Sequence, residues 1–330
     1  MSLITKYGSF WGMIPVTTGR YFWVAPADSY TLEGQSLSAS DSNDGLSPER
    51  AVRTVNRAIT LATASVGDVI VLLPGSHSVS ATVTINKAGL TVVGIPGSTV
   101  ALNSRHGSGG KRLRTQITST ETAGIIFTVS AVDTEIAFIH FAPPAAGGRG
   151  ISLAPLSGAA NRTYIHDCTF ALIATASVTT YGVTVPAGVT ADLLEDTLGS
   201  RCYFLSGTDT TSGANGSAVN TLGTTSSFTI ENSTFELKGT AAWANAILAS
   251  QAGCKGLAIR ECDFINPTSA TTVITTAINA TGQTIDGATQ VHRCYIPAGT
   301  DGVTASAMVD IVLTETYLAN SSGGALVTNA

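Results

Sequence analysis

The chain contains little charge, few aromatic residues and only five cysteines among its 330 residues. Charged side chains make up 12% of the sequence and the formal net charge is −5, which excludes the concentrated basic face that broad nucleic-acid binding requires. No stretch approaches the roughly 18 apolar residues of a membrane span. Residues 1–23 lack a basic region followed by an unbroken apolar core, so we expect no signal peptide and assembly in a cytoplasm.

What the chain does have is a short tag that recurs through its second half. Aligned on a small residue, the copies are separated by 34, 31, 29 and 32 positions. A period near 30, with Thr, Gly, Ser and Ala between copies, is too long for a hairpin and lacks helical periodicity. It predicts a solenoid, a parallel β-helix with about 4.8 Å between coils. The aligned small residues are Cys168, Cys202, Ser233, Cys262 and Cys294.

The positions around this anchor form chemically consistent columns. Three residues before it runs an aliphatic column that Gly199 interrupts. Two residues after it runs a column expected inside the coils: Phe170, Phe204, Phe235, Phe264 and Ile296. One residue before it the charge mostly alternates, which favours solvated pairs worth about 0 to 1 kcal/mol each over a ligand groove along the stack. That column is Asp167, Arg201, Asn232, Glu261 and Arg293.

The cysteines follow the same period. They form no CxxC pair, which argues against a zinc site, and their odd number does not suit a disulfide framework. Stacked, reduced and buried thiols are expected instead. The five are Cys168, Cys202, Cys254, Cys262 and Cys294.

The pattern also extends upstream of the tags. Segments 136–141 and 90–95 fit the same template, and dense β-branched runs precede them at 68–73 and 81–85. We therefore expect roughly nine coils between residue 66 and about residue 320, stacked as one body. The predicted organisation is an attachment segment over 1–26, an initial module with a capping helix over 27–65, and the β-helix over 66–330.

A single helix is expected from residue 47 to about residue 64. Ser47 is a favourable N-cap, Pro48 suits the first turn, and apolar residues then recur at helical spacing. A helix across the open end of a solenoid covers strand edges that would otherwise invite aggregation. Asp41, Asn43 and Asp44 suggest either a calcium loop or an Asx-stabilised turn, and the missing later acidic ligand favours the turn.

The order of these elements resembles one known superfamily. Segments 21–26 and 41–48, the helix, and the run 67–75 look like the first module of pectate-lyase-like proteins. The resemblance implies an all-β fold: a single-stranded right-handed parallel β-helix with a short N-terminal capping α-helix. The superfamily includes pectin and alginate enzymes, surface adhesins, and bacteriophage tailspikes and fibres, so activity has to be argued from residues.

Catalytic candidates are weak. The Asn-Thr-Asp, Asp-Asp and Gly-His-Gly tags of the related hydrolases are absent, and no paired carboxylates adjoin a basic motif of the lyase kind. His77, His140, His166 and His292 have no Ser or Cys nucleophile at a diagnostic spacing. We expect no metal and no cofactor. The weak alternative to a solvated insertion is an acid pair among Asp192, Glu195 and Asp196.

Two other segments are candidates for contacts with partners. A Gly-rich basic loop would touch an acidic glycan or a capsid lattice, or else be a solvated excursion; its residues are Arg105, His106, Lys111, Arg112 and Arg114. The N-terminal segment concentrates aromatic residues, which either pack on its own first coil or anchor an interface. These are Tyr7, Phe10, Trp11, Tyr21, Phe22 and Trp23.

Within the superfamily, the chain is most similar to a virion protein: a head or tail spike or fibre of a bacteriophage. That resemblance implies a non-catalytic homotrimer attached to capsid or tail proteins through residues 1–26, with host cell-surface polysaccharide as a further partner. The alternative is a polysaccharide depolymerase, a lyase or hydrolase. A cell-surface adhesin ranks third, because no export signal is visible.

Overall fold

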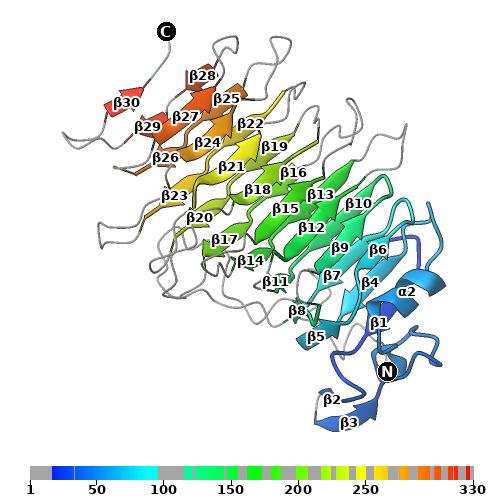
Figure 1. The fold of residues 1–330 in the computed structure, drawn as a ribbon. Helices are drawn as coiled ribbons and strands as arrows, with labels where there is room; N and C mark the ends of the chain where they lie inside the picture. The colour runs from blue at the N-terminus through cyan, green and yellow to red at the C-terminus, as the bar shows by residue number, and fades with distance from the viewer. Residues whose placement is uncertain are drawn as a thin grey trace.

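Three long sheets of parallel strands run along the molecule (Figure 1). The computed structural model describes residues 17–32, 34–95, 115–121, 124–144, 147–154, 162–172, 180–186, 198–206, 217–223, 228–237, 243–249, 256–266, 274, 276–281, 289–297, 301–305, 311–314, 316–318 and 325–327. Within these ranges the chain visits the first, second and third sheet in turn and then begins the next coil. The predicted parallel β-helix is confirmed.

Each sheet takes one strand from each coil. The first sheet contains β1 (Tyr21–Val24), β4 (Val69–Leu72), β7 (Thr91–Gly94), β10 (Thr134–Ala137), β13 (Thr163–His166), β16 (Leu198–Ser200), β19 (Thr229–Glu231), β22 (Ala258–Arg260), β25 (Thr289–His292) and β28 (Ile311–Thr314). The second contains β5 (Gly75–Val79), β8 (Thr115–Ser119), β11 (His140–Ala142), β14 (Thr169–Leu172), β17 (Tyr203–Ser206), β20 (Thr234–Glu236), β23 (Asp263–Ile265), β26 (Tyr295–Ile296), β29 (Thr316–Leu318) and the antiparallel β30 (Ala325–Val327). The third contains β6 (Val83–Ile85), β9 (Ile125–Val129), β12 (Arg149–Leu153), β15 (Tyr181–Val185), β18 (Ser217–Thr221), β21 (Asn245–Ala249), β24 (Thr276–Ala280) and β27 (Asp301–Ala305).

The recurring tag covers parts of two strands. It spans the end of a first-sheet strand, a sharp corner, and the start of a second-sheet strand, as β13 and β14 show on either side of Asp167. Counted from β4–β5–β6, the described strands make eight coils with one strand in each sheet, and β28 and β29 begin a ninth.

The interior is packed by columns in register. Phe141, Phe170, Phe204, Phe235 and Phe264 stack ring on ring, with centroids 4.8–5.1 Å apart and planes within 10° of parallel. The predicted phenylalanine column is therefore confirmed, and it begins one coil earlier than the tags. Such stacked aromatic contacts add to the free energy of burial, which dominates the stability of the rod.

The thiols are buried packing groups, as predicted. Each of the four described cysteines is free and donates its S–H to a main-chain carbonyl of the preceding coil, at 3.7–3.8 Å. Burial raises the pKa of Cys202 to about 12, which keeps its thiol protonated. Cys254 lies outside the described residues.

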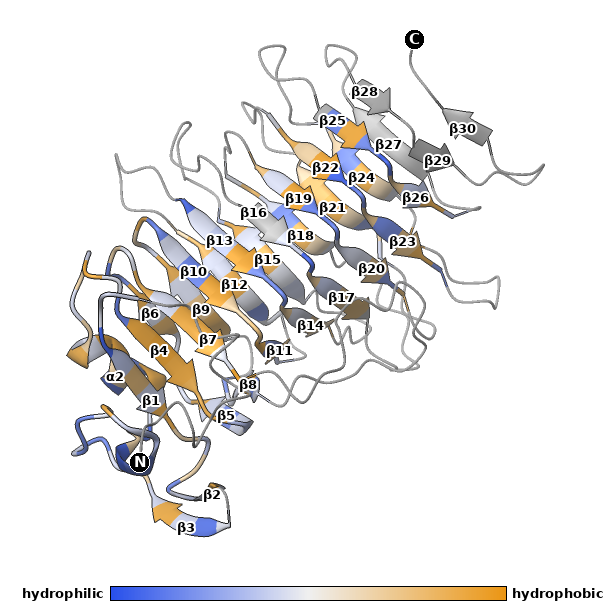
Figure 2. Cartoon of the chain, turned by 180° about the vertical axis from the view of Figure 1, so that it is seen from behind, coloured by the Kyte–Doolittle hydropathy of each residue, from blue (hydrophilic) through white to orange (hydrophobic). Residues whose placement is uncertain are grey.

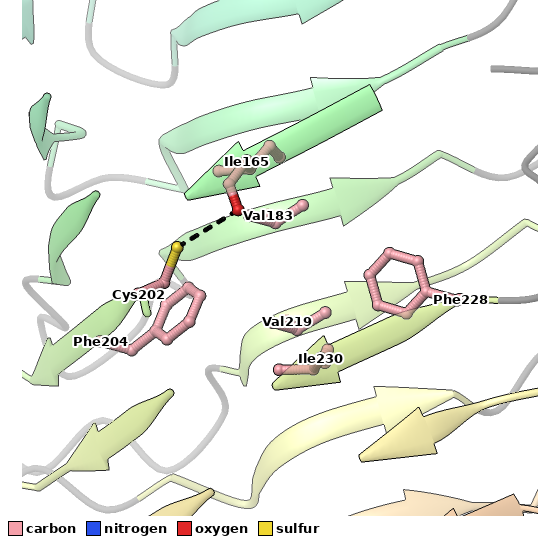
Figure 3. A pocket seen from close by; sticks show the side chains of 7 residues that line it. All are labelled: Ile165, Val183, Cys202, Phe204, Val219, Phe228 and Ile230. Carbon is pink, nitrogen blue, oxygen red and sulfur yellow. Dashed lines mark hydrogen bonds between the residues drawn. The ribbon is translucent and has the colours of Figure 1, made fainter. Parts of the chain in front are cut away.

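Gly199 leaves a gap in the aliphatic column. It pairs in register with Ile165 below and Ile230 above. Beside it the core contains a small apolar cavity of about 10 Å³ (Figure 3). The side chains around the cavity are those of Ile165, Val183, Cys202, Phe204, Val219, Phe228 and Ile230.

The capping region differs from the single predicted helix. The 3₁₀ helix η1 (Pro48–Arg50) and the α-helix α2 (Val55–Leu61) are separate. They are divided because Val52 bridges to Val24, which requires extended backbone there. Ser47 makes no side-chain cap bond; Thr54 caps α2 instead and accepts from the amide of Arg57. The helix packs against β1, β4 and β6 at the N-terminal end of the rod, as expected for a cap (Figure 1).

The acidic turn before the helix is structural, as predicted. Oδ1 of Asp41 accepts from the amides of Arg53 and Thr54 at 2.9 Å, and Nδ2 of Asn43 donates to the carbonyl of Ala51. Asp44 accepts from the amide of Leu46. The bond of Asp44 is the local bond of an Asx turn, whereas those of Asp41 and Asn43 tie the turn to the segment that leads into α2.

A second apolar cluster lies outside the first sheet at its N-terminal end. Its members include Trp23, Val71, Val93 and Ala137, which follow one another in register along the outer face, and Tyr30 of the antiparallel hairpin β2 (Ser29–Leu32) and β3 (Gln35–Ser38). Strands β4 and β7 are correspondingly orange in Figure 2. Beyond Ala137 the same outer column continues with His166, so the face changes from apolar to polar at this point.

Candidate functional site

Most of the predicted site residues fall outside the part of the chain that the structure describes. These are Tyr7, Phe10, Trp11, Arg105, His106, Lys111, Arg112, Arg114, Asp192, Glu195 and Asp196. Their proposed roles remain predictions.

The three described aromatics of the N-terminal segment belong to the rod. Tyr21, Phe22 and Trp23 form β1, which pairs with β4. Phe22 is 1% exposed in the main core and Trp23 is 3% exposed in the second apolar cluster. The expectation that these two rings anchor an exposed interface is therefore wrong, because both are buried within the chain itself.

The corner between the first and second sheets carries the outward-facing charge. Asp167, Arg201, Asn232, Glu261 and Arg293 all adopt left-handed backbone there, with φ of 49–52°. Residues other than glycine rarely adopt this backbone region, but each coil needs it to turn sharply from the first sheet to the second. The amide of each of the first four donates to a carbonyl of the next coil at 2.8–3.2 Å, which offsets the strain. The predicted charge pairs form between Arg201 and Asp167 and, more loosely at 3.8 Å, between Arg293 and Glu261.

Four side chains near this corner form a connected network rather than separate pairs. We call it the His166 cluster: Glu135 of β10, His166 of β13, and Asp167 and Arg201 of two successive corners. Nε2 of His166 lies 2.9 Å from Oε1 of Glu135, and Nδ1 lies 2.7 Å from Oδ2 of Asp167. Arg201 donates to both oxygens of Asp167 from Nε and Nη2, at 2.9 and 2.6 Å. The cluster thus ties three successive coils together.

Uncharged neighbours fix the orientation of the ring. Tyr164, two residues earlier in β13, stacks on His166 with centroids 4.3 Å apart, and the ring of Phe138 meets it edge-on at 5.8 Å. Thr91 of β7 donates to the second oxygen of Glu135 at 3.0 Å. His166 is 8% exposed and Asp167 is 7% exposed, whereas the side chains of Glu135 and Arg201 are 31% and 43% exposed, so the cluster is buried at its centre and reaches solvent at both ends.

The electrostatics of the cluster favour its charged form. Burial opposes the charge of His166, but hydrogen bonds and attraction from Asp167 and Glu135 outweigh it and raise the pKa of the imidazole. The hydrogen bond from His166 lowers the pKa of Glu135. Burial raises the pKa of Asp167, but His166 and Arg201 more than reverse this, and the result is lowered. Two positive and two negative groups therefore balance one another.

This arrangement is poorly suited to general-acid hydrolysis of a glycosidic bond. That chemistry needs one carboxyl group that stays protonated near neutral pH, usually with a raised pKa. Both carboxylates here have lowered pKa values, and each is held by a cationic neighbour. Among the described residues no group of His, Cys, Asp and Glu side chains is arranged to hold a metal ion.

Sequence reasoning recognised the pairing of Asp167 with Arg201 but missed the cluster. His166 was considered only for a nucleophile at a fixed spacing. The missed signal lies in the repeat itself: placing 135 beside 164, as the template predicts, brings Glu135 next to His166 on the same outer face.

Comparison with known proteins shows a similarity of fold and nothing more. No protein-family model matches the chain, and no curated protein matches it. Among solved structures, the chain is similar to pectate lyase Pel9A, with 15% identity, a TM-score of 0.45, and coverage of 93% of this chain and 80% of that one. It is similar to a rhamnogalacturonan lyase, with 10% identity, a TM-score of 0.41, and coverage of 86% and 75%.

A third similar structure is ORF18 of Geobacillus virus E2, with 13% identity and a TM-score of 0.41. The likeness covers 81% of this chain but only 57% of that protein, so the chain spans little more than half of its length. Likenesses this weak decide nothing about activity, and the fold rests on the strand pairing itself. Of the helices in the described ranges, none is long and apolar enough to cross a membrane.

Proposed function

We propose that the chain is a structural rod of a bacteriophage virion, a spike or fibre on head or tail. The observation that carries the proposal is how its described polar groups are used: at the corner they pair between coils and reinforce the stack. Beneath them, a continuous column of stacked rings and a column of small buried side chains, four of them thiols, run through successive coils. Such a stack is a stiff spacer, the part that a projecting virion protein requires.

The decisive test is the composition of the virion. We expect purified particles to contain the chain at a fixed copy number, measured by quantitative mass spectrometry against the major capsid protein. A copy number matching capsid vertices would indicate a head spike, and a few copies would indicate the tail. Particles free of the chain would contradict the proposal.

Attachment through the N-terminus is tested by a truncation that the structure defines. Deleting residues 1–16 spares β1 and the bonds that hold it, such as that from the amide of Arg20 to Asp68 at 2.7 Å. The truncated rod should keep its circular dichroism spectrum and melting temperature but fail to join virions. A truncated chain that is incorporated normally would place the attachment site elsewhere.

We further propose a homotrimer, the usual assembly of the spikes and fibres that the sequence resembles. Size-exclusion chromatography with light scattering should give three times the mass of the chain. A stable monomer across the working concentration range would contradict this assembly.

A polysaccharide depolymerase of the lyase kind is the second candidate, and the observation that favours it is the pair of ionised carboxylates beside His166 on an outer face, since a lyase needs a base to abstract a proton. Reducing-end and unsaturated-product assays on bacterial polysaccharides would detect turnover. Loss of turnover in Glu135→Gln, or in Asp192→Asn or Glu195→Gln, would locate the reaction and overturn the purely structural proposal.

A further inference from the structure

The protonation of His166 can be read from the atoms around it. Both ring nitrogens lie within hydrogen-bond distance of an ionised carboxylate oxygen, on Glu135 and on Asp167. An ionised carboxylate only accepts, whereas a neutral imidazole has a single N–H. Neutral His166 would therefore turn a lone pair toward one carboxylate at under 3 Å. The geometry fits the doubly protonated ring.

The surroundings offer no substitute for the missing proton. In the described part of the chain, the charged or titratable groups that face the ring are Glu135 from β10, Tyr164 from β13, Asp167 from its own corner and Arg201 from the next. Nη2 of Arg201 lies 3.5 Å from Nδ1, but it already donates to Asp167 at 2.6 Å. Deprotonation would leave Asp167 paired with Arg201 alone and Glu135 facing a neutral ring.

The position of the ring links the loss of its proton to the packing of the outer face. His166 directly follows Trp23, Val71, Val93 and Ala137 in the outer column of the first sheet, at the point where the second apolar cluster ends. Phe138, which packs on that cluster, touches the imidazole edge-on. The ion pairs of His166 therefore lie directly against the end of the second apolar cluster.

We propose that the His166 cluster is a proton-operated clamp that fastens the third, fourth and fifth coils on the outer face of the first sheet and loosens when His166 loses its proton. The clamp is independent of the proposed virion role, since it follows from the contacts of these four side chains. It is closed below the ordinary pKa of histidine, about 6.5, and opens as the pH rises through the raised pKa of His166 in the folded chain.

The direction follows from linkage. A group whose folded-state pKa is raised stabilises the fold fully below its unfolded value of 6.5 and loses that contribution as the pH rises through the folded value. Glu135 and Asp167 have lowered pKa values, so their contribution is present above about pH 4 and is lost only in stronger acid. The clamp is therefore strongest between these limits.

The test combines a direct titration of His166 with a measurement of local opening by hydrogen exchange. Nuclear magnetic resonance of the histidine-labelled chain, with the His166 signal assigned through His166→Gln, should show its ring titrating above the ordinary range. Hydrogen exchange in β10 and β13, corrected for the intrinsic effect of pH, should rise about twofold or more across that titration. Exchange in β22 should not.

Matched variants separate the clamp from general stability. Glu135→Gln supplies an amide N–H to a neutral imidazole, so the His166 titration should shift to lower pH and the opening of the clamp should shift with it. Asp133→Asn removes an exposed ion pair with Arg162 at 2.6 Å between the residues that precede the same two strands. This pair contains no histidine, so the substitution should leave the titration of His166 in place. Titration of His166 at its ordinary value, or identical pH profiles for wild type and Glu135→Gln, would overturn the proposal.

Discussion

At the scale of the residue, small side chains matter as much as large ones. Ile165 and Ile230 fill their places in the aliphatic column, whereas Gly199 between them leaves the cavity shown in Figure 3. Gly182 is the opposite case, because an added Cβ would lie 2.8 Å from a ring carbon of Phe204 and 2.8 Å from the carbonyl oxygen of Ala218. The same amino acid is therefore a defect at one position and a requirement at the other.

These two glycines provide a paired prediction. Gly199→Ala should raise the free energy of unfolding by about 0.5–1 kcal/mol, since it adds apolar contact and restricts the unfolded chain. Gly182→Ala should lower it by about 1–3 kcal/mol through overpacking. Urea denaturation measures both, and a stabilising Gly182→Ala would show that the ring column shifts freely.

A second residue-scale prediction concerns acid stability. Burial lowers the pKa of His77 to about 4, and the neutral ring bonds to the carbonyl of Leu73 at 2.8 Å. Because the unfolded chain binds this proton at higher pH than the folded one, stability should fall as the pH drops from 6.5 toward 4, by about 3 kcal/mol. His77→Gln should flatten this acid slope in calorimetric melts, and an acid slope unchanged by the substitution would contradict the prediction.

Residues also show where sequence reasoning reaches its limit. The phenylalanine column was predictable because one residue type recurs at one period. The left-handed corner was not, because Asp167, Arg201, Asn232, Glu261 and Arg293 occupy it without a single glycine. Their conformation is imposed by hydrogen bonds to the next coil, which no local pattern encodes.

At the scale of the element, tertiary pairing overrides local propensity. The segment 47–64 has a helical pattern from end to end, yet the bridge of Val52 to Val24 interrupts it. The tag likewise encodes two strands and a corner because the first and second sheets meet there. Sequence analysis predicted the stack and the cap, but not the three strands in each coil, since strands such as β18 lack the tag.

The divided helix leads to a matched pair of cap variants. Thr54→Ala removes the bond to the amide of Arg57 at 3.1 Å and the hydroxyl bond to Asp41 at 2.8 Å. It should cost about 1–2 kcal/mol, the usual range for a lost N-cap. Ser47→Ala should change stability by less than about 0.5 kcal/mol, because Ser47 makes no cap bond. Equal losses in thermal melts would mean that the longer helix forms in solution.

At the scale of the whole molecule, each coil rests only on its neighbours. The strand order in all three sheets follows the chain order, so contacts join consecutive coils in a nearly one-dimensional array. The stability of such an array is approximately a sum of coil terms and nearest-neighbour terms. The position of the His166 cluster could be inferred from this register, whereas its hydrogen bonds needed the side chains themselves.

This architecture predicts that damage stays local. Phe235→Ala should cost about 3–5 kcal/mol because it opens a cavity in the middle of the ring column, where Phe204 and Phe264 stack on either side. Native-state hydrogen exchange should then lose protection in β17, β20 and β23 while β4 and β7 keep theirs, since those strands lie several coils away. Thr234→Ala, one residue earlier and only half-buried, is the matched control. A uniform loss of protection from β4 to β25 would instead show that the rod unfolds as one cooperative unit.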